Sequence, residues 1–406
     1  ILIAITGHLD REGGNVWFHP VKRLRLDTLA SRIPKEIMAK KLGEDVPRAK
    51  LLMNRASLYP ELFESMMTGE PYKIRSLIIF SANPMSTSRD TQFVANWLKS
   101  LEFTVIFEIK ATPTCRYADI VLPSAARAEC GMEPCYRYNH FILDNKVIEP
   151  SWEARNHNEV ILELGCRLGD PEDFWNGNYE EMLKEYLKDS GITLEELKEN
   201  KEGIYLAESE WMKKRERYEE HFKMLPNHKV QLYNRVLEKF DFDPMPVYRG
   251  EPESPGNAPE LFKEYPLIFT DEHSTYSTHH SWMRNVPSLI KIRKHSLAKI
   301  NPKTAEAYGI EDGEWIEIES PHGKMKAVAW IFPGIVPGVI MGQHGWWEGC
   351  KELDLPEYVT TNGGTEVNVL YSWKYHDPFA ITSISKNTLV KIRKASSPEG
   401  VFPIEL

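Results

Sequence analysis

Apolar and polar residues alternate through the last third of the chain, a pattern typical of half-buried β-strands. Residues 315–320 alternate in this way, residues 321–324 (Pro-His-Gly-Lys) have the composition of a turn, and residues 325–331 resume the alternation. This order predicts a β-hairpin. Two Pro-Gly pairs then bound another short connection, so that strands recur about every ten residues, as in a small barrel.

One short helix interrupts this β-pattern. Asn301 is a favourable N-cap, Pro302 suits the first helical position, and Gly309 can end a helix. We therefore predict a helix over residues 302–308 in a domain that is otherwise mainly β.

The first half of the chain shows a different order of elements. Residues 74–80 and 103–108 are short apolar runs suited to buried parallel strands, and a third run covers residues 118–123. A helix is predicted between the first two, at residues 92–101. Strand–helix–strand order with short connections indicates an α/β layer that binds ligands at the carboxyl ends of its strands.

A charge-rich insert with helical spacing covers residues 170–224. Its apolar residues recur three or four positions apart at 179–187, 194–198 and 211–222. Packing against the α/β layer is the expected role of this insert, and a surface for a partner protein is the alternative.

Composition bounds the class of protein. The 406 residues, of which 42% are apolar and 27% charged, provide material for two or three domains. No apolar run approaches the roughly 18 residues of a membrane span. The net charge of −9 argues against a nucleic-acid groove, which needs a concentrated basic face.

Metal-ligand spacings are scarce in the sequence. The five cysteines include no Cys-x-x-Cys pair, and Cys130 with Cys135 is the closest candidate for a metal or redox pair. A histidine-rich group could bind zinc or iron directly and support hydrolysis, although no His-x-x-x-His spacing occurs. The alternative is that these histidines are hydrogen-bonding loop residues; they are His273, His279, His280, His295 and His344.

Two polar residues stand next to the predicted parallel strands. Asn83 follows the first strand and Asp119 lies at the third, where a ligand of such a layer would bind. Asparagine offers a donor and an acceptor while aspartate accepts from an exocyclic amine, so the two together can read a purine edge. Each residue type is also common in ordinary turns.

Several segments, taken in order, resemble the molybdopterin oxidoreductases, the family related to dimethyl sulfoxide reductase. Thr6-Gly7-His8 through Gly13-Gly14-Asn15 is similar to a stretch that lies about halfway along that family, and Asn83-Pro84 and Ala118–Pro123 are similar to its guanine-contacting loops. The later segments that resemble the family are residues 279–285, 301–313, 344–347 and 362–370. Residues 129–139 depart from the family pattern.

The resemblance implies a fold and a domain boundary. A Rossmann-like α/β cofactor-binding domain, incomplete at its N-terminus and carrying the 170–224 insert, is expected over residues 1–259. A molybdopterin dinucleotide-binding domain, a six-stranded double-psi-like β-barrel, is expected over residues 260–406. The Pro/Gly/Glu-rich linker 250–259 marks the boundary.

The resemblance also implies cofactor contacts, while no metal ligand is identified. Ser81, Asn83 and Asp119 are expected to contact one guanine nucleotide arm. Phosphate and pterin atoms are expected to contact loop residues of the second domain, whose donors suit them. These are His280, Ser281, Arg284, Asn285, His344, Asn368 and Lys386.

The function implied is that of the C-terminal portion of a catalytic subunit. In the family, an N-terminal portion supplies a [4Fe-4S] cluster, the first nucleotide-binding domain and the metal ligand, and the chain starts in mid-pattern at Ile1, as if cut from something larger. A bis(molybdopterin guanine dinucleotide) with molybdenum or tungsten is the expected cofactor, for transfer of oxygen, sulfur or a hydride equivalent. Expected partners are the missing N-terminal portion and an iron–sulfur electron-transfer subunit. The alternatives are a separate cofactor-capping or nucleotide-binding subunit and a non-redox enzyme like acetylene hydratase.

Overall fold

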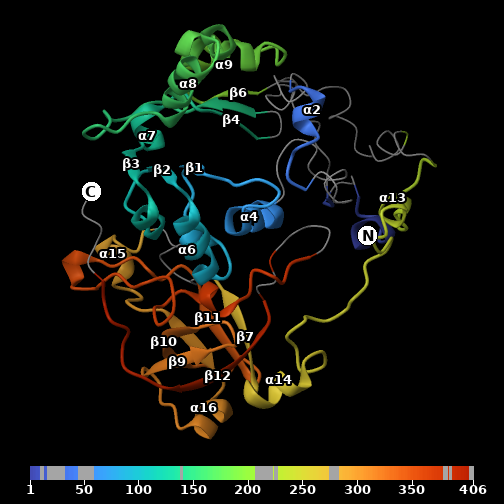
Figure 1. Ribbon diagram of the computed structural model, residues 1–406, viewed down its shortest axis with the longest axis vertical. Coiled ribbons are helices and arrows are strands. Elements are labelled where there is room, and N and C mark those ends of the chain that lie inside the picture. The colour runs from blue at the N-terminus through green and yellow to red at the C-terminus, as the bar shows by residue number, and fades with distance from the viewer. Residues whose placement is uncertain are drawn as a thin grey trace. The chain divides into compact units, whose positions relative to one another are not determined.

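The computed structural model describes residues 1–9, 13–15, 33–43, 59–137, 140–205, 223, 227–273, 283–377, 383 and 386–401 (Figure 1). The chain divides into two compact units, and each unit is built from two separate segments. Unit 1 comprises residues 1–56 and 123–247, and unit 2 comprises residues 57–122 and 248–406. In this division residues 57–122, where the parallel strands were predicted, group with residues 248–406. The domain boundary at residues 259 and 260 stays a prediction.

Unit 1 is built around a small antiparallel sheet and a group of helices. The sheet has the order β4-β5-β6 and pairs Cys135 with Ile142. Its strands are β4 (Pro134–Arg137), β5 (His140–Leu143) and β6 (Ile204–Tyr205). The helices are α1 (Leu2–Ile5), α2 (Lys35–Met38), α7 (Arg127–Cys130), α8 (His157–Leu168), η3 (Pro171–Gly177), α9 (Tyr179–Leu187), α10 (Leu194–Glu199) and α13 (Arg235–Lys239).

The predicted insert forms helices where the apolar spacing placed them, at α9 and α10. Its buried residues Leu183, Leu187 and Leu194 share one core with Phe141 of β5 and Leu162 of α8. The described part of the insert therefore packs on the unit 1 sheet and on α8. Residues 206–222, which include the third predicted helix, lie outside the described residues.

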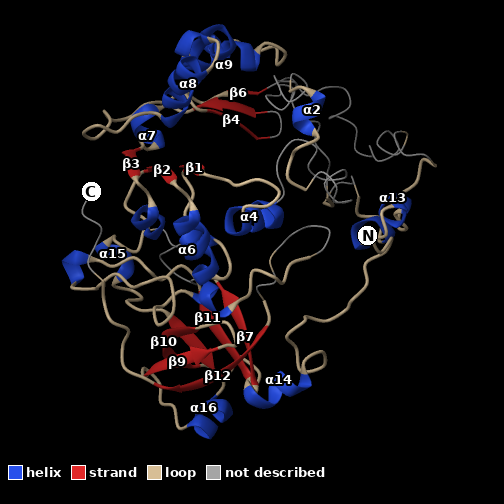
Figure 2. Ribbon diagram, in the orientation of Figure 1, coloured by secondary structure: helices blue, strands red, loops and turns tan. Residues whose placement is uncertain are grey.

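The first segment of unit 2 is an α/β layer (Figure 2). Strands β1 (Ser76–Phe80) and β2 (Phe103–Glu108) are parallel, and β3 (Ile120–Pro123) follows β2 in the order β1-β2-β3. Helix α6 (Thr91–Ser100) begins at Asp90, whose carboxylate accepts a hydrogen bond from the backbone N–H of Phe93. The remaining helices are α4 (Tyr59–Thr68), α5 (Pro84–Thr87) and η2 (Pro113–Tyr117).

The second segment of unit 2 contains a closed barrel with the strand order β10-β8-β11-β7-β12-β9. This confirms the six-stranded barrel. The pairs β8–β10 and β7–β11 are parallel, and the other neighbours are antiparallel. Its strands are β7 (Leu267–Glu272), β8 (Leu297–Ile300), β9 (Trp315–Glu319), β10 (Lys324–Ile331), β11 (Val339–Gln343) and β12 (Thr388–Lys394). Short helices are α14 (Pro259–Glu264), α15 (Pro287–Ile290), α16 (Pro302–Tyr308), η4 (Lys351–Leu353) and η5 (Val367–Leu370).

Local sequence accounts for the barrel's regular parts. Every second residue is buried along β9 and along β10 as far as Ala329, so Ile316, Ile318 and Met325 lie fully inside the core. Helix α16 spans residues 302–308 as predicted: the Asn301 side chain accepts a hydrogen bond from the backbone N–H of Lys303, and Gly309 ends the helix at φ 63°. Within the described ranges, no helix combines the length and apolar character that a bilayer crossing requires.

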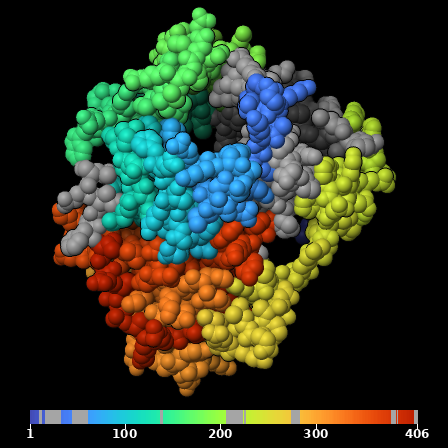
Figure 3. Space-filling model, viewed as in Figure 1, coloured from blue at the N-terminus to red at the C-terminus, as the bar shows by residue number. Residues whose placement is uncertain are grey.

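The two segments of unit 2 pack directly on each other, as the space-filling view shows where the 59–122 segment meets the barrel segment (Figure 3). Ser86 of α5 donates to Glu366, and Asn368 of η5 donates to the carbonyl oxygen of Ser86. Phe93 of α6 stacks on Trp373 with ring centroids 4.3 Å apart. The candidate site lies along this contact.

Candidate functional site

The loop after β1 carries two of the predicted contact residues. Ser81 has a left-handed backbone (φ 48°), and its N–H donates to the carbonyl oxygen of Phe107 at 3.1 Å. Asn83 accepts a hydrogen bond of 2.6 Å from Thr114 at its Oδ1, while its Nδ2 is buried and has no partner among the described residues. A buried donor without a partner costs about 1–3 kcal/mol. The Asn83 amide is therefore a ready donor for an acceptor atom of a ligand.

Asp119 lies at the opposite end of the same sheet. Its carboxylate accepts a hydrogen bond of 2.7 Å from the backbone N–H of Thr104, the second residue of β2, and β3 begins only at Ile120. Asn83, in contrast, follows the carboxyl end of β1, which runs parallel to β2 in register. The expectation that Asp119 and Asn83 share one ligand edge is therefore wrong, because Asp119 precedes its strand and is bound to the backbone there.

Arg89 extends from the loop between α5 and α6 to the barrel. Its guanidinium donates to Oδ1 of Asn368 and lies 4.7 Å from the ring centre of Tyr371. It also lies 4.0 Å from the carboxylate of Asp271, the fifth residue of β7. The side chain of Arg89 is 17% exposed, so this cation is largely withdrawn from water.

The carboxylate of Asp271 also binds two further groups of the site. Nδ1 of His344 donates to it at 2.8 Å, and Nζ of Lys386 donates to it at 3.0 Å. Burial alone would raise the pKa of Asp271, but the His344 hydrogen bond and the charges of Arg89 and Lys386 outweigh it and lower the pKa to about 2. Asp271 is therefore ionised, and Arg89 with Lys386 leaves an excess of positive charge around it.

Glu366 and Asn368 form a buried layer beneath these groups. Glu366 accepts from Ser86 Oγ at 3.0 Å and from the N–H of Gly345 at 3.4 Å, and its burial raises its pKa. Asn368 Nδ2 donates to the carbonyl oxygen of Ser86 at 2.5 Å and to Glu366 at 3.3 Å. Since Arg89 occupies its Oδ1, both ends of the Asn368 amide are already bound. Asn368 positions the α5 loop against the barrel.

Arg284 is fully buried and supports the strand end that carries His344. Its Nε donates to the carbonyl oxygen of Gly345 at 2.6 Å, its Nη2 donates to that of His344 at 2.9 Å, and its guanidinium lies 4.0 Å from the centre of a Trp346 ring. Burial lowers the pKa of Arg284 to about 10, although Glu366 and Glu348 oppose the shift. A direct ligand contact was expected here, but the structure places this cation behind the site surface.

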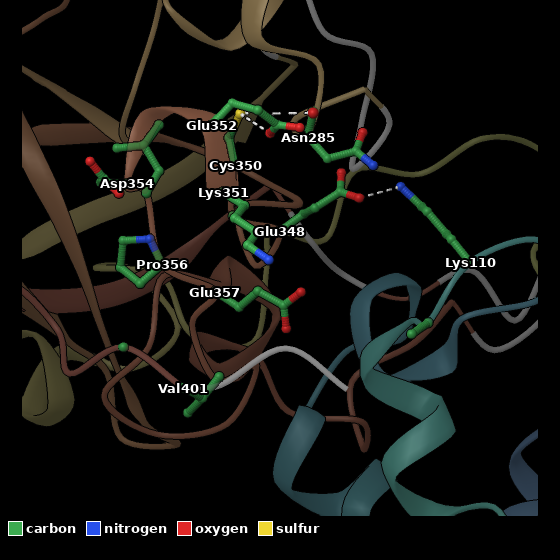
Figure 4. A pocket seen from close by; sticks show the side chains of 14 residues that line it. Lys110, Asn285, Glu348, Cys350, Lys351, Glu352, Asp354, Pro356, Glu357 and Val401 are labelled. Carbon is green, nitrogen blue, oxygen red and sulfur yellow. Dashed lines mark hydrogen bonds and ion pairs between the residues drawn. The ribbon is translucent and has the colours of Figure 1, made fainter. Parts of the chain in front are cut away.

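The other predicted residues fall in different places. Asn285 is exposed and lines a separate pocket of about 710 Å³ (Figure 4). His280 and Ser281 lie outside the described residues. His273 packs edge-on against His344, with ring centroids 4.8 Å apart, whereas His295 packs against Trp315. In the part of the chain that the structure describes, no group of three His, Cys, Asp or Glu residues could hold a metal ion.

The structure thus brings Asn368, His344 and Lys386 into one cluster and adds three residues that the sequence did not single out: Arg89, Asp271 and Glu366. Arg89 directly precedes a helix cap and Asp271 is the last residue but one of a strand, so both resemble ordinary boundary residues in the sequence. Only the packing of the α5 loop on the barrel reveals their role.

Two family models match this chain. Residues 28–167 match the model described as molybdopterin oxidoreductase, and residues 267–389 match the model described as molydopterin dinucleotide binding domain. The two parts of the site, the loop after β1 and the barrel loops, fall within these ranges.

Curated relatives align with much of the chain. Acetylene hydratase of Syntrophotalea acetylenica is 29% identical over 72% of this chain and 40% of its own length. Dopamine dehydroxylase of Eggerthella lenta is 25% identical over 99% of this chain and 47% of its own length, and dimethyl sulfoxide reductase DmsA of Escherichia coli is 27% identical over 73% and 38%. The chain therefore spans about half the length, or less, of these relatives.

A solved structure shares the fold. Acetylene hydratase from Pelobacter acetylenicus superposes with a TM-score of 0.77 at 22% sequence identity, covering 94% of this chain and 56% of that one. At this identity the likeness concerns the fold.

Proposed function

This chain belongs to the molybdopterin oxidoreductase family and carries its dinucleotide-binding domain, and from this premise we propose that it is the C-terminal portion of the catalytic subunit of a molybdenum or tungsten oxidoreductase. The observation that carries the proposal is the cluster of Arg89, Asp271, His344 and Lys386. Arg89 lies in the range that one family model matches, and the other three residues lie in the range that the second model matches. The expected cofactor is bis(molybdopterin guanine dinucleotide).

The donors of this cluster fit such a cofactor. Arg89 and Lys386 are cations that suit phosphate oxygens, and His344 is a ring donor or acceptor suited to pterin atoms. Nδ2 of Asn83, which has no partner among the described residues, supplies one more donor at the carboxyl end of β1, where ligands of parallel sheets bind. When bound, the metal and its dithiolenes supply the two-electron chemistry.

The residues of the chain bind and orient. Asp271 accepts from His344 and from Lys386, so it fixes the His344 ring with Nδ1 as donor. Arg284 holds the backbone that carries His344. The buried layer of Glu366 and Asn368 keeps water away from the back of the cluster.

The remaining half of the relatives' length is where we place the iron–sulfur cluster, the first nucleotide-binding domain and the metal ligand. Unit 2 of this chain then contributes one wall of the cofactor site. An iron–sulfur electron-transfer subunit is the expected further partner. A separate subunit that caps a cofactor held by another chain is the alternative architecture.

The reaction type has two candidates. Similarity to dimethyl sulfoxide reductase and trimethylamine-N-oxide reductase favours transfer of an oxygen atom, at 26–27% identity. Similarity to acetylene hydratase, at 29% identity, favours a hydration without net redox change. We propose the redox reaction first, because the relatives named as reductases or dehydrogenases outnumber the hydratase among those compared.

Metal and pterin analysis of protein purified from its native source, with the intact mass measured on the same sample, tests the proposal. We expect molybdenum or tungsten in stoichiometric amount and a mass well above 46.9 kDa. Metal and pterin with a mass of 46.9 kDa would indicate a separate capping subunit. Absence of both metal and pterin would refute the cofactor assignment.

A further inference from the structure

The loop between β5 and α8, residues 144–156, presents large apolar side chains to solvent. Trp152 is 100% exposed, and Val147 and Ile148 are each more than half exposed. In Figure 1 this green loop runs out from the body of unit 1 beside α7 and α8. Burial of a tryptophan side chain removes about 150–250 Å² of surface from water, so contact with a partner at Trp152 would be strongly favourable.

Hydrogen bonds hold the loop in this conformation. The buried carboxylate of Glu129 in α7 accepts from the backbone N–H of Ser151 at 3.0 Å and from its hydroxyl group at 2.8 Å. The N–H of Ala154 donates to the carbonyl oxygen of Ser151 at 3.0 Å, which closes a turn around Trp152. Trp152 has a left-handed backbone (φ 52°) that bulky residues seldom adopt. Because the loop is ordered in advance, Trp152 can bind a partner at a low cost in conformational entropy.

The outer side of barrel strands β8 and β10 carries a cluster of aromatic rings and cations. The guanidinium of Arg293 lies 4.5 Å from the ring centre of Trp330, and Nζ of Lys299 lies 5.2 Å from the ring centres of Trp330 and Phe332. Lys299 and Trp330 are paired directly across the two strands. Ile292, next to Arg293 in the chain, is more than half exposed. Arginine and tryptophan are the residue types enriched where protein interfaces gain most of their binding energy.

The two surfaces are complementary in charge. Residues 285–305 contain five Lys and Arg residues and no Asp or Glu, although the chain has a net charge of −9. Lys291 and Lys294 of this stretch are exposed. Residues 147–154 of the loop contain two glutamates and no Lys or Arg. An acidic and apolar loop in unit 1 therefore matches a basic surface with apolar and aromatic side chains in unit 2.

We propose that these two surfaces bind each other between two copies of this protein, with Trp152 of one copy packed against Ile292 and Arg293 of the other and Glu153 paired with Lys294. A pair of copies related by a twofold axis makes this contact twice. Two tryptophans, with the area that they cover on the other copy, bring the interface to the order of 1,000 Å² that specific association needs. The inference goes beyond the proposed function and does not depend on the cofactor or the reaction.

Sedimentation velocity of the complete gene product, over a dilution series, tests the proposal. We expect a dimer whose dissociation constant rises several-fold when the salt concentration is raised from about 50 mM to about 500 mM, because salt screens the charge pairs. Trp152→Ala should raise the dissociation constant about tenfold or more, and Trp152→Phe should raise it less. Tyr248→Ala is the matched control, because it removes an aromatic side chain that is 93% exposed and lies outside both surfaces. It should leave the dissociation constant unchanged.

A charge exchange tests the pairing itself. Glu153→Lys and Lys294→Glu should each raise the dissociation constant, and both changes in one chain should restore dimerisation, because each contact then holds the exchanged pair. Restoration also excludes misfolding as the cause of the single effects. Glu260→Lys reverses an exposed charge elsewhere in unit 2 and should have no effect. A monomer at every concentration, a dimer that Trp152→Ala leaves intact, or single reversals that their combination does not restore would overturn the proposal.

Discussion

Replacing Asp271 by asparagine tests whether this carboxylate holds the cluster together. Asp271 is 6% exposed and has a pKa of about 2, against an ordinary value of 3.8. Each pKa unit corresponds to about 1.4 kcal/mol, so the ionised form contributes about 2.5 kcal/mol to the free energy of unfolding. We expect Asp271→Asn to lower that free energy by at least this amount at pH 7, because Arg89 and Lys386 also lose their shared counter-charge.

The sign of the pH dependence follows from the lowered pKa. A carboxyl group whose pKa is depressed in the folded state contributes its full stabilisation above the unfolded pKa of 3.8, and loses it as pH falls toward about 2. The difference between the parent and Asp271→Asn should therefore be constant from pH 7 to about pH 5 and then shrink.

Urea unfolding curves, recorded by tryptophan fluorescence across this pH range, provide the measurement. Glu306→Gln serves as the control, since it also removes one carboxylate from unit 2, and it should leave the free energy of unfolding within about 0.5 kcal/mol of the parent. If Asp271→Asn were as stable as the parent at pH 7, or if its deficit persisted unchanged at the lowest pH, the argument that three basic groups stabilise the Asp271 charge would be refuted.

Three further changes have defined outcomes. Arg89→Gln should reduce the affinity for the pterin cofactor by about tenfold or more, measured by the pterin retained after gel filtration. Arg89→Lys should retain part of this affinity, because the positive charge remains but the planar guanidinium that binds Asn368 is lost. Equal pterin retention in the two variants would contradict the role given to the guanidinium. Phe269→Ala should cost about 3–5 kcal/mol in urea unfolding, since Phe269 is fully buried in the barrel core, and a loss below about 1 kcal/mol would show that this core repacks freely. Gly364→Ala should lower the thermal stability, because the added Cβ would lie 1.8 Å from the carbonyl oxygen of Val359 and the loop before η5 could not keep its conformation. Normal thermal stability of this variant would disprove that close approach.

The sequence by itself determined the elements whose cause is local. Helix α16 has the bounds that Asn301, Pro302 and Gly309 predict, and the β9–β10 hairpin follows the alternation of its residues. The apolar runs that form strands β1 and β2 are likewise local in the sequence. Caps, turns and periodicity act within a few residues, so a window of sequence contains the whole reason for them.

The candidate site was only partly predictable. His344, Asn368 and Lys386 came from the resemblance to the family, and the structure brings them together. Nothing in the neighbouring sequence distinguishes Arg89 from other loop residues or Asp271 from other strand residues. Their role depends on the contact between them, which only the tertiary structure forms.

Tertiary structure alone decided which polar groups pair and which remain free for a ligand. Asp119 bonds to Thr104 at the amino end of β2, and Arg284 is buried behind His344, although both carry side chains suited to direct contacts. How deeply a polar side chain is buried sets the free-energy cost of leaving it without a hydrogen-bond partner. Which partner a site residue finds depends on how the loop after β1 packs on the barrel. Such pairings join residues far apart in the chain, such as Ser86 and Asn368, which are 282 positions apart, and no local pattern along the chain encodes them.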